Sequence, residues 1–324
     1  PSVIRIDDIS TSQQNLLFVK NDGSVYGAGQ NANYQLGLGQ NISRNYFVSS
    51  SIQPRVIQVA TGNDYSLFLK YDGTVFITGS GMSIRYIKNP ASTTDIHLKD
   101  EQYQRNIREE QKFPVLISGI GNIVQISSGP THAAFLTVNG KVYHSHIGQF
   151  EFPSFLPAIN GQGKVIGASE IVQVSCGKLF TLFLKIDGTV QSLGYNAHGQ
   201  LGDGTTTSKT SLVNISGLSD IEQVSAGLSH SAFLKKDGTV FACGNNNKGQ
   251  LGDGTTTNKL TPTNVQDIYD VKQVTCGTAH TVFVTKSDKV FACGANNVGQ
   301  LGDNTYVDKL KPVNVFNIDD LSNY

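Results

Sequence analysis

Histidine recurs in this chain at one position of a short glycine loop. The pattern Gly-x-x-His ends at His132, His230 and His280. Each of these histidine side chains is a candidate for binding a partner protein. A residue that recurs in phase also suits a packing role, and that alternative stays open beside the binding role.

Three further loops keep this phase but carry other residues at the histidine position. Tyr65 and Phe180 occupy it in two loops, and Asn15 occupies it in the first copy. The loop before Tyr65 reads Gly-Asn-Asp, so Asn63 and Asp64 add an amide and a carboxylate to the candidate surface. Groups of this kind are suited to binding a charged partner.

Other catalytic and metal-binding patterns are missing from the sequence. There is no Gly-x-Ser-x-Gly elbow, no phosphate-binding P-loop and no His-Glu-x-x-His pair. Cys176, Cys243, Cys276 and Cys293 lack Cys-x-x-Cys spacing, which argues against a zinc site and favours small buried thiols. We therefore expect no covalent catalysis, no metal and no cofactor.

The charge of the chain is balanced. Its 324 residues include 25 Lys plus Arg and 25 Asp plus Glu, and charged residues make up only 15% of the total. Nucleic-acid binding as the main role is disfavoured, because neutralising phosphates needs a basic excess. No apolar run is long enough to span a membrane as a helix. With 34 glycines and 38% hydrophobic residues, the composition indicates short strands joined by many turns.

An internal repeat organises these positions. A phenylalanine marks each of six copies, which are centred on Phe18, Phe68, Phe135, Phe183, Phe233 and Phe283. The copies are about 50 residues apart, with one longer interval between the second and the third. Repeats of this length are typical of propellers and arrays whose units are stable only together. The two ends of the chain overlap in phase, as closure of a ring requires.

The pattern within each copy predicts several short strands. Segments rich in β-branched and aromatic residues flank Asp-Gly pairs such as Asp22-Gly23 and Asp237-Gly238. An Asp-Gly pair predicts a tight hairpin, and a type I′ turn would give both residues a positive φ. The glycines of Gly-x-x-His and Gly-Gln-Leu-Gly are expected at bends that also need a positive φ. The chain is thus predicted to be an all-β, single β-propeller domain over 1–324, with four-stranded blades.

The composite pattern G-x-x-H-(S/T)-x-F-L-x-x-D-G-x-V-x-x-x-G-x-N-x-x-G-Q-L-G resembles the regulator of chromosome condensation repeat. It is clearest over residues 171–215, 221–265 and 271–315. The resemblance implies a propeller that exchanges guanine nucleotides on a small GTPase, with Ran as the family's usual partner. Six blades follow from the period, and seven stay open because the family commonly has seven.

The resemblance also implies which residues would contact the GTPase. Asp64 resembles the family's aspartate in a Gly-Asn-Asp-His loop, with Tyr65 in place of the histidine. His230 and His280 resemble its loop histidines. By phase, the family's β-hairpin wedge would fall near 40–50. The set expected to bind a GTPase is Asn63, Asp64, Tyr65, His132, Phe180, His230 and His280.

The repeat breaks in two neighbouring copies, with irregular insertions expected at about 80–118 and 144–164. Residues 95–112 are rich in charge, and Thr94 or Asp95 could cap a short helix there. Surface drift and a partner-binding surface are both open for these segments. The residues expected at a loop interface are Tyr46, Phe47, Tyr103, Arg105, Phe150, Phe152 and Phe155.

Two functions remain compatible with the sequence. The first is a guanine-nucleotide exchange factor-like binder of Ran or a related GTPase, expected as a monomer in the cytoplasm or nucleus. An asparagine-rich composition and near-identical repeats resemble bacterial versions, which implies an effector acting in the host cytoplasm. The alternative is a scaffold or inhibitor that binds a protein through the propeller face and the two insertions without exchange.

Overall fold

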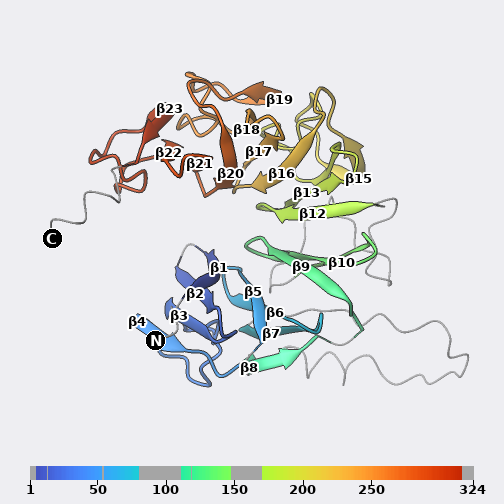
Figure 1. The fold of residues 1–324 in the computed structure, drawn as a ribbon, viewed down its shortest axis with the longest axis vertical. Coiled ribbons are helices and arrows are strands. Elements are labelled where there is room, and N and C mark those ends of the chain that lie inside the picture. Colours follow the sequence, from blue (N-terminus) through green and yellow to red (C-terminus); the bar gives the residue numbers. More distant parts are fainter. Residues whose placement is uncertain are drawn as a thin grey trace, which may run out of the picture. The chain divides into compact units, whose positions relative to one another are not determined.

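The computed structural model describes residues 5–12, 14–52, 55–79, 111–117, 119–146 and 170–315. These residues form antiparallel sheets that follow one another along the chain, each built from strands in sequence order (Figure 1). Two compact units result, the first made mainly of residues 1–153 and the second mainly of residues 170–324. We call the sheets blades 1 to 6 in chain order.

The first unit holds blades 1 to 3. Blade 1 is β1 (Ile6–Thr11), β2 (Asn15–Lys20), β3 (Val25–Gly29) and β4 (Arg44–Ser49). Blade 2 is β5 (Val56–Thr61), β6 (Tyr65–Lys70), β7 (Val75–Gly79) and β8 (Gln111–Leu116). Blade 3 has three strands within the described residues, β9 (Ile123–Ser128), β10 (His132–Thr137) and β11 (Val142–His146).

The second unit holds blades 4 to 6, each with four strands. Blade 4 is β12 (Ile171–Cys176), β13 (Phe180–Lys185), β14 (Val190–Gly194) and β15 (Lys209–Asn214). Blade 5 is β16 (Ile221–Ala226), β17 (His230–Lys235), β18 (Val240–Gly244) and β19 (Lys259–Asn264). Blade 6 is β20 (Val271–Cys276), β21 (His280–Thr285), β22 (Val290–Gly294) and β23 (Lys309–Asn314).

The two predicted insertions are shorter than expected. Residues 111–116 form β8, the fourth strand of blade 2, which pairs with β7. Residues 144–146 belong to β11 and pair with β10. The predicted cap at Thr94 or Asp95, the middle of both insertions, and the overlap of the chain ends lie outside the described residues.

The Asp-Gly hairpins form, but the predicted turn type is wrong. Gly23, Gly73, Gly188 and Gly238 have φ between 77° and 85°, whereas none of the preceding aspartates is among the residues with positive φ. Asp237 instead keeps a negative φ and accepts a hydrogen bond on Oδ1 from the Thr239 N–H at 2.9 Å. This is a three-residue turn with one left-handed residue, stabilised by the aspartate side chain.

Within each unit the core lies between neighbouring blades. In the first unit Phe68 of blade 2 packs with Leu17 and Val25 of blade 1. In the second unit Phe233 of blade 5 packs with Leu182 and Leu201 of blade 4. In these two blades the recurring phenylalanine therefore fills the space toward the preceding blade, which explains why the repeat keeps it. Burying a side chain of this size contributes about 2–3 kcal/mol.

The first strands of neighbouring blades are joined by side-chain hydrogen bonds to the backbone. In blade 5 the Gln223 Oε1 accepts from the Val274 N–H of blade 6 at 2.8 Å. Gln173 makes the same bond to the Val224 N–H at 2.8 Å, and Gln58 to the Ile126 N–H at 2.7 Å. We call these bonds the first-strand bridges. They satisfy backbone groups that no strand ladder reaches.

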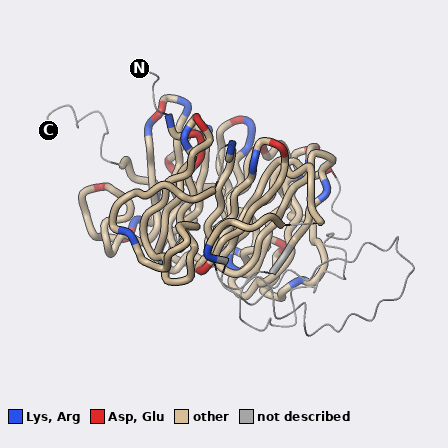
Figure 2. The backbone as a smooth tube through the Cα atoms, turned by 90° about the horizontal axis from the view of Figure 1, so that it is seen from below, with Lys and Arg blue, Asp and Glu red and all other residues tan. Residues whose placement is uncertain are grey.

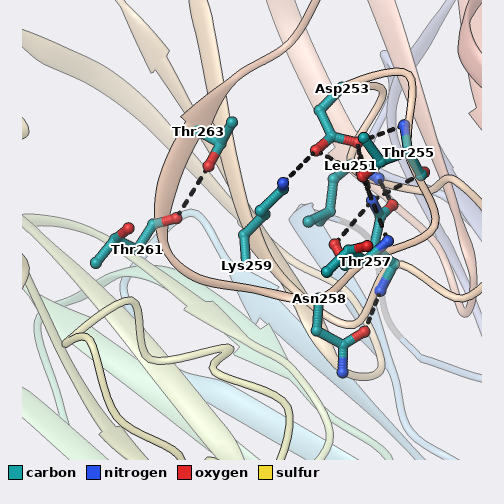
Figure 3. Close-up of polar contacts among 9 residues, drawn as sticks. Leu251, Asp253, Thr255, Thr257, Asn258, Lys259, Thr261 and Thr263 are labelled. Carbon is teal, nitrogen blue, oxygen red and sulfur yellow. Dashed lines mark hydrogen bonds and ion pairs between the residues drawn. The ribbon is translucent and has the colours of Figure 1, made fainter.

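A buried asparagine organises each loop between the third and fourth strands of blades 4 to 6. In blade 5 the Asn246 amide donates to Asp253 Oδ1 at 2.9 Å and to the carbonyl oxygens of Thr255 and Thr257 at 3.0 and 3.2 Å. Its Oδ1 accepts from the Leu251 N–H at 3.0 Å. Figure 3 shows Asp253, Thr255 and Thr257 of this loop, with Lys259 paired to Asp253.

We predict that Asn246→Ala lowers the free energy of unfolding by about 2–4 kcal/mol, because it leaves buried loop groups without partners. Asn247→Ala is the matched control, since the exposed Asn247 lies next in the chain, and its effect is expected within about 0.5 kcal/mol. Urea unfolding followed by circular dichroism measures both. Equal effects of the two changes would contradict the organising role of Asn246.

Candidate functional site

The residue at the histidine position begins the second strand of its blade and points inward. Four of the side chains expected to bind a GTPase are buried, with exposed fractions of 0–1%: Tyr65, His132, Phe180 and His230. His280 is partly buried. The predicted direct contact of the four buried side chains with a partner is therefore corrected to a packing role.

The glycine before this position is required for a different reason from the one predicted. Gly62, Gly177, Gly227 and Gly277 are not among the residues with positive φ. A Cβ on Gly227 would overlap the ring of His230, and one on Gly62 would overlap the ring of Tyr65. The glycine thus leaves room for a ring that folds back over the loop. The glycines of Gly-Gln-Leu-Gly do have positive φ, as predicted, with Gly249 at 79° and Gly252 at 67°.

These buried rings also connect neighbouring blades through polar atoms. The Tyr65 hydroxyl lies 2.8 Å from the Gly129 carbonyl oxygen and 2.7 Å from that of His132, both in blade 3. In the second unit His230 Nε2 lies 3.0 Å from Thr281 Oγ1 of blade 6. A tyrosine and a histidine therefore perform the same bridging task in different blades.

Burial changes the protonation of His230. Loss of water around the ring, and to a smaller extent the nearby His280, lower the pKa of His230 to about 3. Burial also lowers the pKa of His280. Both rings are therefore neutral at physiological pH, and His230 is unsuited to exchange protons with a ligand.

The loops themselves present other residues to solvent. Within each unit neighbouring loops are joined through the backbone, as in the bond from the Asn63 N–H to the Pro130 carbonyl at 3.2 Å. In the second unit the Lys178 N–H donates to Leu228 and the Leu228 N–H to Gly277. Asn63, Lys178 and Thr278 are exposed along these rims.

Asp64 is the acidic member of the rim in the first unit. Its Oδ1 accepts a hydrogen bond from Asn33 Nδ2 of blade 1 at 2.9 Å, which fixes the carboxylate at the end of blade 2. The side chain is partly exposed, and none of the ion pairs among the described residues involves it. The sequence analysis missed Asn33, although its place in the copy beside Gly-Gln-Leu-Gly was a usable signal.

The residues expected at a loop interface fall into two groups. Tyr46 and Phe47 lie on β4, the fourth strand of blade 1, with exposed fractions of 61% and 53%. The segment expected to hold a wedge, 40–50, thus contains the strand β4, whose pairing with β3 shifts register at residues 45–47. The remaining five lie outside the described residues: Tyr103, Arg105, Phe150, Phe152 and Phe155.

The thiols and metal-ligating side chains form no separate site in the described part of the chain. Cys176, Cys243 and Cys293 are buried and form no disulfide, and burial raises the pKa of Cys243 and Cys293 well above the usual range. No cluster of His, Cys, Asp and Glu there could hold a metal ion. The described thiols accordingly serve packing.

Charge is sparse and mixed. Figure 2 shows a few basic and acidic positions of both signs against mostly uncharged backbone. Among the described residues there is no helix long and apolar enough to cross a membrane. Charge alone therefore singles out no face among the described residues, and individual groups such as Asp64 indicate the candidate site.

We predict that His230→Phe makes the protein less sensitive to acid than the wild type. The unfolded histidine titrates near 6.5 and the folded one near 3, so the unfolded state binds the extra proton between these values and wild-type stability falls as pH drops. Between about pH 7.5 and about pH 5, the wild type should lose roughly 2 kcal/mol more than the variant. Phenylalanine is the natural choice because Phe180 occupies this position in blade 4.

Urea unfolding at the two pH values measures this difference, and His198→Phe serves as a control on a histidine outside the buried position. An unchanged pH dependence in His230→Phe would contradict the buried neutral state of His230.

Comparison with known proteins agrees with this geometry. Two family models described as the regulator of chromosome condensation (RCC1) repeat match the chain. One covers residues 22–69, 187–234 and 237–284, and the other covers 171–200, 221–250 and 271–300. The matched segments contain the phenylalanine strands, the Asp-Gly turns and the asparagine-centred loops described above.

Curated relatives share the repeat within longer proteins. The human "Probable E3 ubiquitin-protein ligase HERC3" is 31% identical over 211 residues, which are 61% of this chain and 18% of the relative. The Arabidopsis thaliana "Ultraviolet-B receptor UVR8" is 29% identical over 217 residues, 65% of this chain and 46% of the relative. The chain spans less than half the length of either protein.

Solved structures share the fold. Yeast RCC1 (Prp20), in a complex with Kap60, matches with a TM-score of 0.78 at 20% identity, over 96% of this chain and 75% of that one. Human WBSCR16 matches with a TM-score of 0.76 at 22% identity, over 97% and 82%. The blades described here are those of a six-bladed, all-β propeller, as predicted. The chain belongs to the regulator of chromosome condensation (RCC1) repeat family.

Proposed function

We propose that this propeller binds a small GTPase of the Ran type through the loops that precede the second strands, and that it promotes release of the bound nucleotide. Asp64 is the group on which the proposal rests. Its carboxylate is held by Asn33 at 2.9 Å, is partly exposed, and takes part in none of the ion pairs among the described residues.

A carboxylate held in this way suits a cationic partner. The hydrogen bond from Asn33 orients Asp64 and leaves acceptor capacity on its other oxygen. The phosphate-binding loop of a small GTPase carries a lysine that pairs with the nucleotide phosphates. An acidic side chain presented to that lysine competes with the nucleotide for it.

Nucleotide release requires no covalent step by this protein. If the propeller binds the nucleotide-free GTPase more tightly than the loaded form, linkage requires that it weaken nucleotide affinity by the same factor. Asp64 would contribute to this difference, because the GTPase lysine is free for it only when the phosphates have left. The buried rings of Tyr65 and His230 would keep the loops in place rather than contact the GTPase.

Known relatives give this proposal partial support. Prp20p from Saccharomyces cerevisiae has a similar fold and is described as binding Gsp1p and histones. The match has 20% identity and a TM-score of 0.75. Other relatives are described as ubiquitin ligases and a light receptor, so the repeat itself is compatible with several activities.

The second candidate is a scaffold that binds a protein without promoting exchange. The buried state of His132, Phe180 and His230 favours it, because these residues leave fewer groups for direct action on a GTPase. In a scaffold of this kind the exposed loops bind the partner protein but do not promote nucleotide release. A monomeric state, a cytoplasmic or nuclear location and an origin as a bacterial effector stay predictions.

We predict that Asp64→Asn slows release of a fluorescent GDP analogue from the responsive GTPase at least ~10-fold, a loss of about 1.4 kcal/mol. The substitution keeps an oxygen that can accept from Asn33 and removes only the charge. Asp72→Asn is the matched control, because Asp72 follows β6 at the other end of the same blade and is exposed. Release is measured across a panel of small GTPases that includes Ran.

The outcomes separate the candidates. Acceleration that Asp64→Asn removes and Asp72→Asn preserves supports exchange through this loop. Binding without acceleration favours the scaffold. Absence of binding to every member of the panel refutes the GTPase proposal.

A further inference from the structure

The fourth strand of blade 1 lacks an ion pair that the blades of the second unit have. The strands β15, β19 and β23 each begin with a lysine whose Nζ pairs with an aspartate of the preceding loop: Lys209 with Asp203 at 3.2 Å, Lys259 with Asp253 at 3.2 Å, and Lys309 with Asp303 at 3.1 Å. The same register in β4 carries Arg44, which lies opposite Gly29 as Lys259 lies opposite Gly244. Leu38 replaces the aspartate.

Arg44 is consequently a cation without an internal carboxylate among the described residues. Its Nη2 donates to the amide oxygen of Gln40 at 3.1 Å. Its Nε is buried and has no hydrogen-bond partner in the described part of the chain. Leaving a buried charged donor unsatisfied is unfavourable, so this position is stabilised by any acceptor that reaches it.

The strand β4 also lacks the proline that the fourth strands of three other blades carry. The fourth residue of β8, β19 and β23 is a proline, which has no backbone N–H group: Pro114, Pro262 and Pro312. Proline within a sheet is confined to edge strands, to first residues and to bulges, and these three prolines lie where the pairing of their strands shifts register. In β4 the same position holds Phe47, so the backbone there keeps an N–H group that an added strand can use.

Aromatic side chains accompany this open edge. Tyr46 and Phe47 are 61% and 53% exposed. The Phe47 ring packs edge-on against Phe18 at 5.0 Å between ring centres, and Phe18 stacks on Tyr26 at 5.5 Å. The pairing of β4 with β3 shifts register between Gly27 and Gly29, so residues 45–47 form a bulge in which both aromatic side chains are exposed.

We propose that the outer edge of β4 binds an extended peptide of a partner protein by strand addition, with acidic side chains of the peptide beside Arg44 and apolar side chains beside Tyr46 and Phe47. Main-chain hydrogen bonds to β4 give affinity, and the acidic and apolar side chains of the peptide give specificity. The Arg44 guanidinium forms an ion pair with a carboxylate of the peptide. This pair corresponds to the ones that Asp203, Asp253 and Asp303 form with the lysines of blades 4 to 6. This site is independent of the GTPase proposal, which uses Asp64.

The test uses a fluorescein-labelled peptide of about eight residues that alternates glutamate and valine, the pattern expected of an added strand. A peptide of the same length that alternates lysine and valine is the charge control. Fluorescence anisotropy with the full chain is expected to show saturable binding of the glutamate peptide and at least ~10-fold weaker binding of the lysine peptide.

Two variants locate the binding. Phe47→Pro removes the N–H group of residue 47, as proline does in β8, β19 and β23, and Arg44→Gln gives β4 the residue that begins β8. Each is expected to weaken the glutamate peptide at least ~10-fold. Leu212→Pro is the matched control at the same register of β15, where Lys209 already has its aspartate, and should leave binding unchanged.

Circular dichroism shows whether each variant is folded. If Phe47→Pro fails to fold, the binding measured with Arg44→Gln alone tests the proposal. Equal binding of both peptides, full binding by Arg44→Gln, or no binding of the glutamate peptide to the wild type would each overturn the proposal.

Discussion

The structure depends on hydrogen bonds that pass from a side chain of one blade to the backbone of the next. A single blade cannot bury both of its faces, so its stability comes from its neighbours. Apolar packing between blades supplies most of that stabilisation but leaves polar backbone groups along the first strands. Gln58, Gln173 and Gln223 reach across and accept from the N–H groups of Ile126, Val224 and Val274. In blade 1 Asp8 performs this task toward Val59, and burial raises the pKa of its carboxyl.

This constraint decides which positions are free to act on a partner. The residue at the histidine position is fixed by the same need, because Tyr65 and His230 each carry a polar atom to the next blade. Asn246 and its counterparts, Asn196 and Asn296, are fixed by the loops that they organise. The side chains that make none of these bonds are therefore the ones available to bind a partner. Asp64 and Arg44 are two such positions, and each carries a charge that no carboxylate or cation of the described chain neutralises.

Much of the fold follows from the sequence, because the repeat shows the number of blades and the alternation of buried residues directly. The fourth strand of blade 2 was missed because residues 111–116 follow a long segment without the repeat pattern. The turn type was wrong because the Asp237 side chain, rather than the backbone alone, stabilises the hairpin. The inward direction of His230 had a usable signal, since Tyr65 and Phe180 occupy the same phase and all three are rings that fill space. The missing aspartate beside Arg44 was also visible in the sequence, but its meaning depends on the pair between Lys259 and Asp253 that only the structure shows.

The first-strand bridges are tested most directly by amide hydrogen exchange at Val274. In the wild type this N–H donates to Gln223 at 2.8 Å, outside any strand ladder. Gln223→Leu removes the acceptor and keeps the side-chain size, while Glu222→Gln changes the exposed neighbour as a control. Exchange at Val274, followed by nuclear magnetic resonance, should become at least ~10-fold faster in Gln223→Leu and stay unchanged in Glu222→Gln. Equal protection of Val274 in both variants would contradict the claim that side chains of one blade hold the backbone of the next.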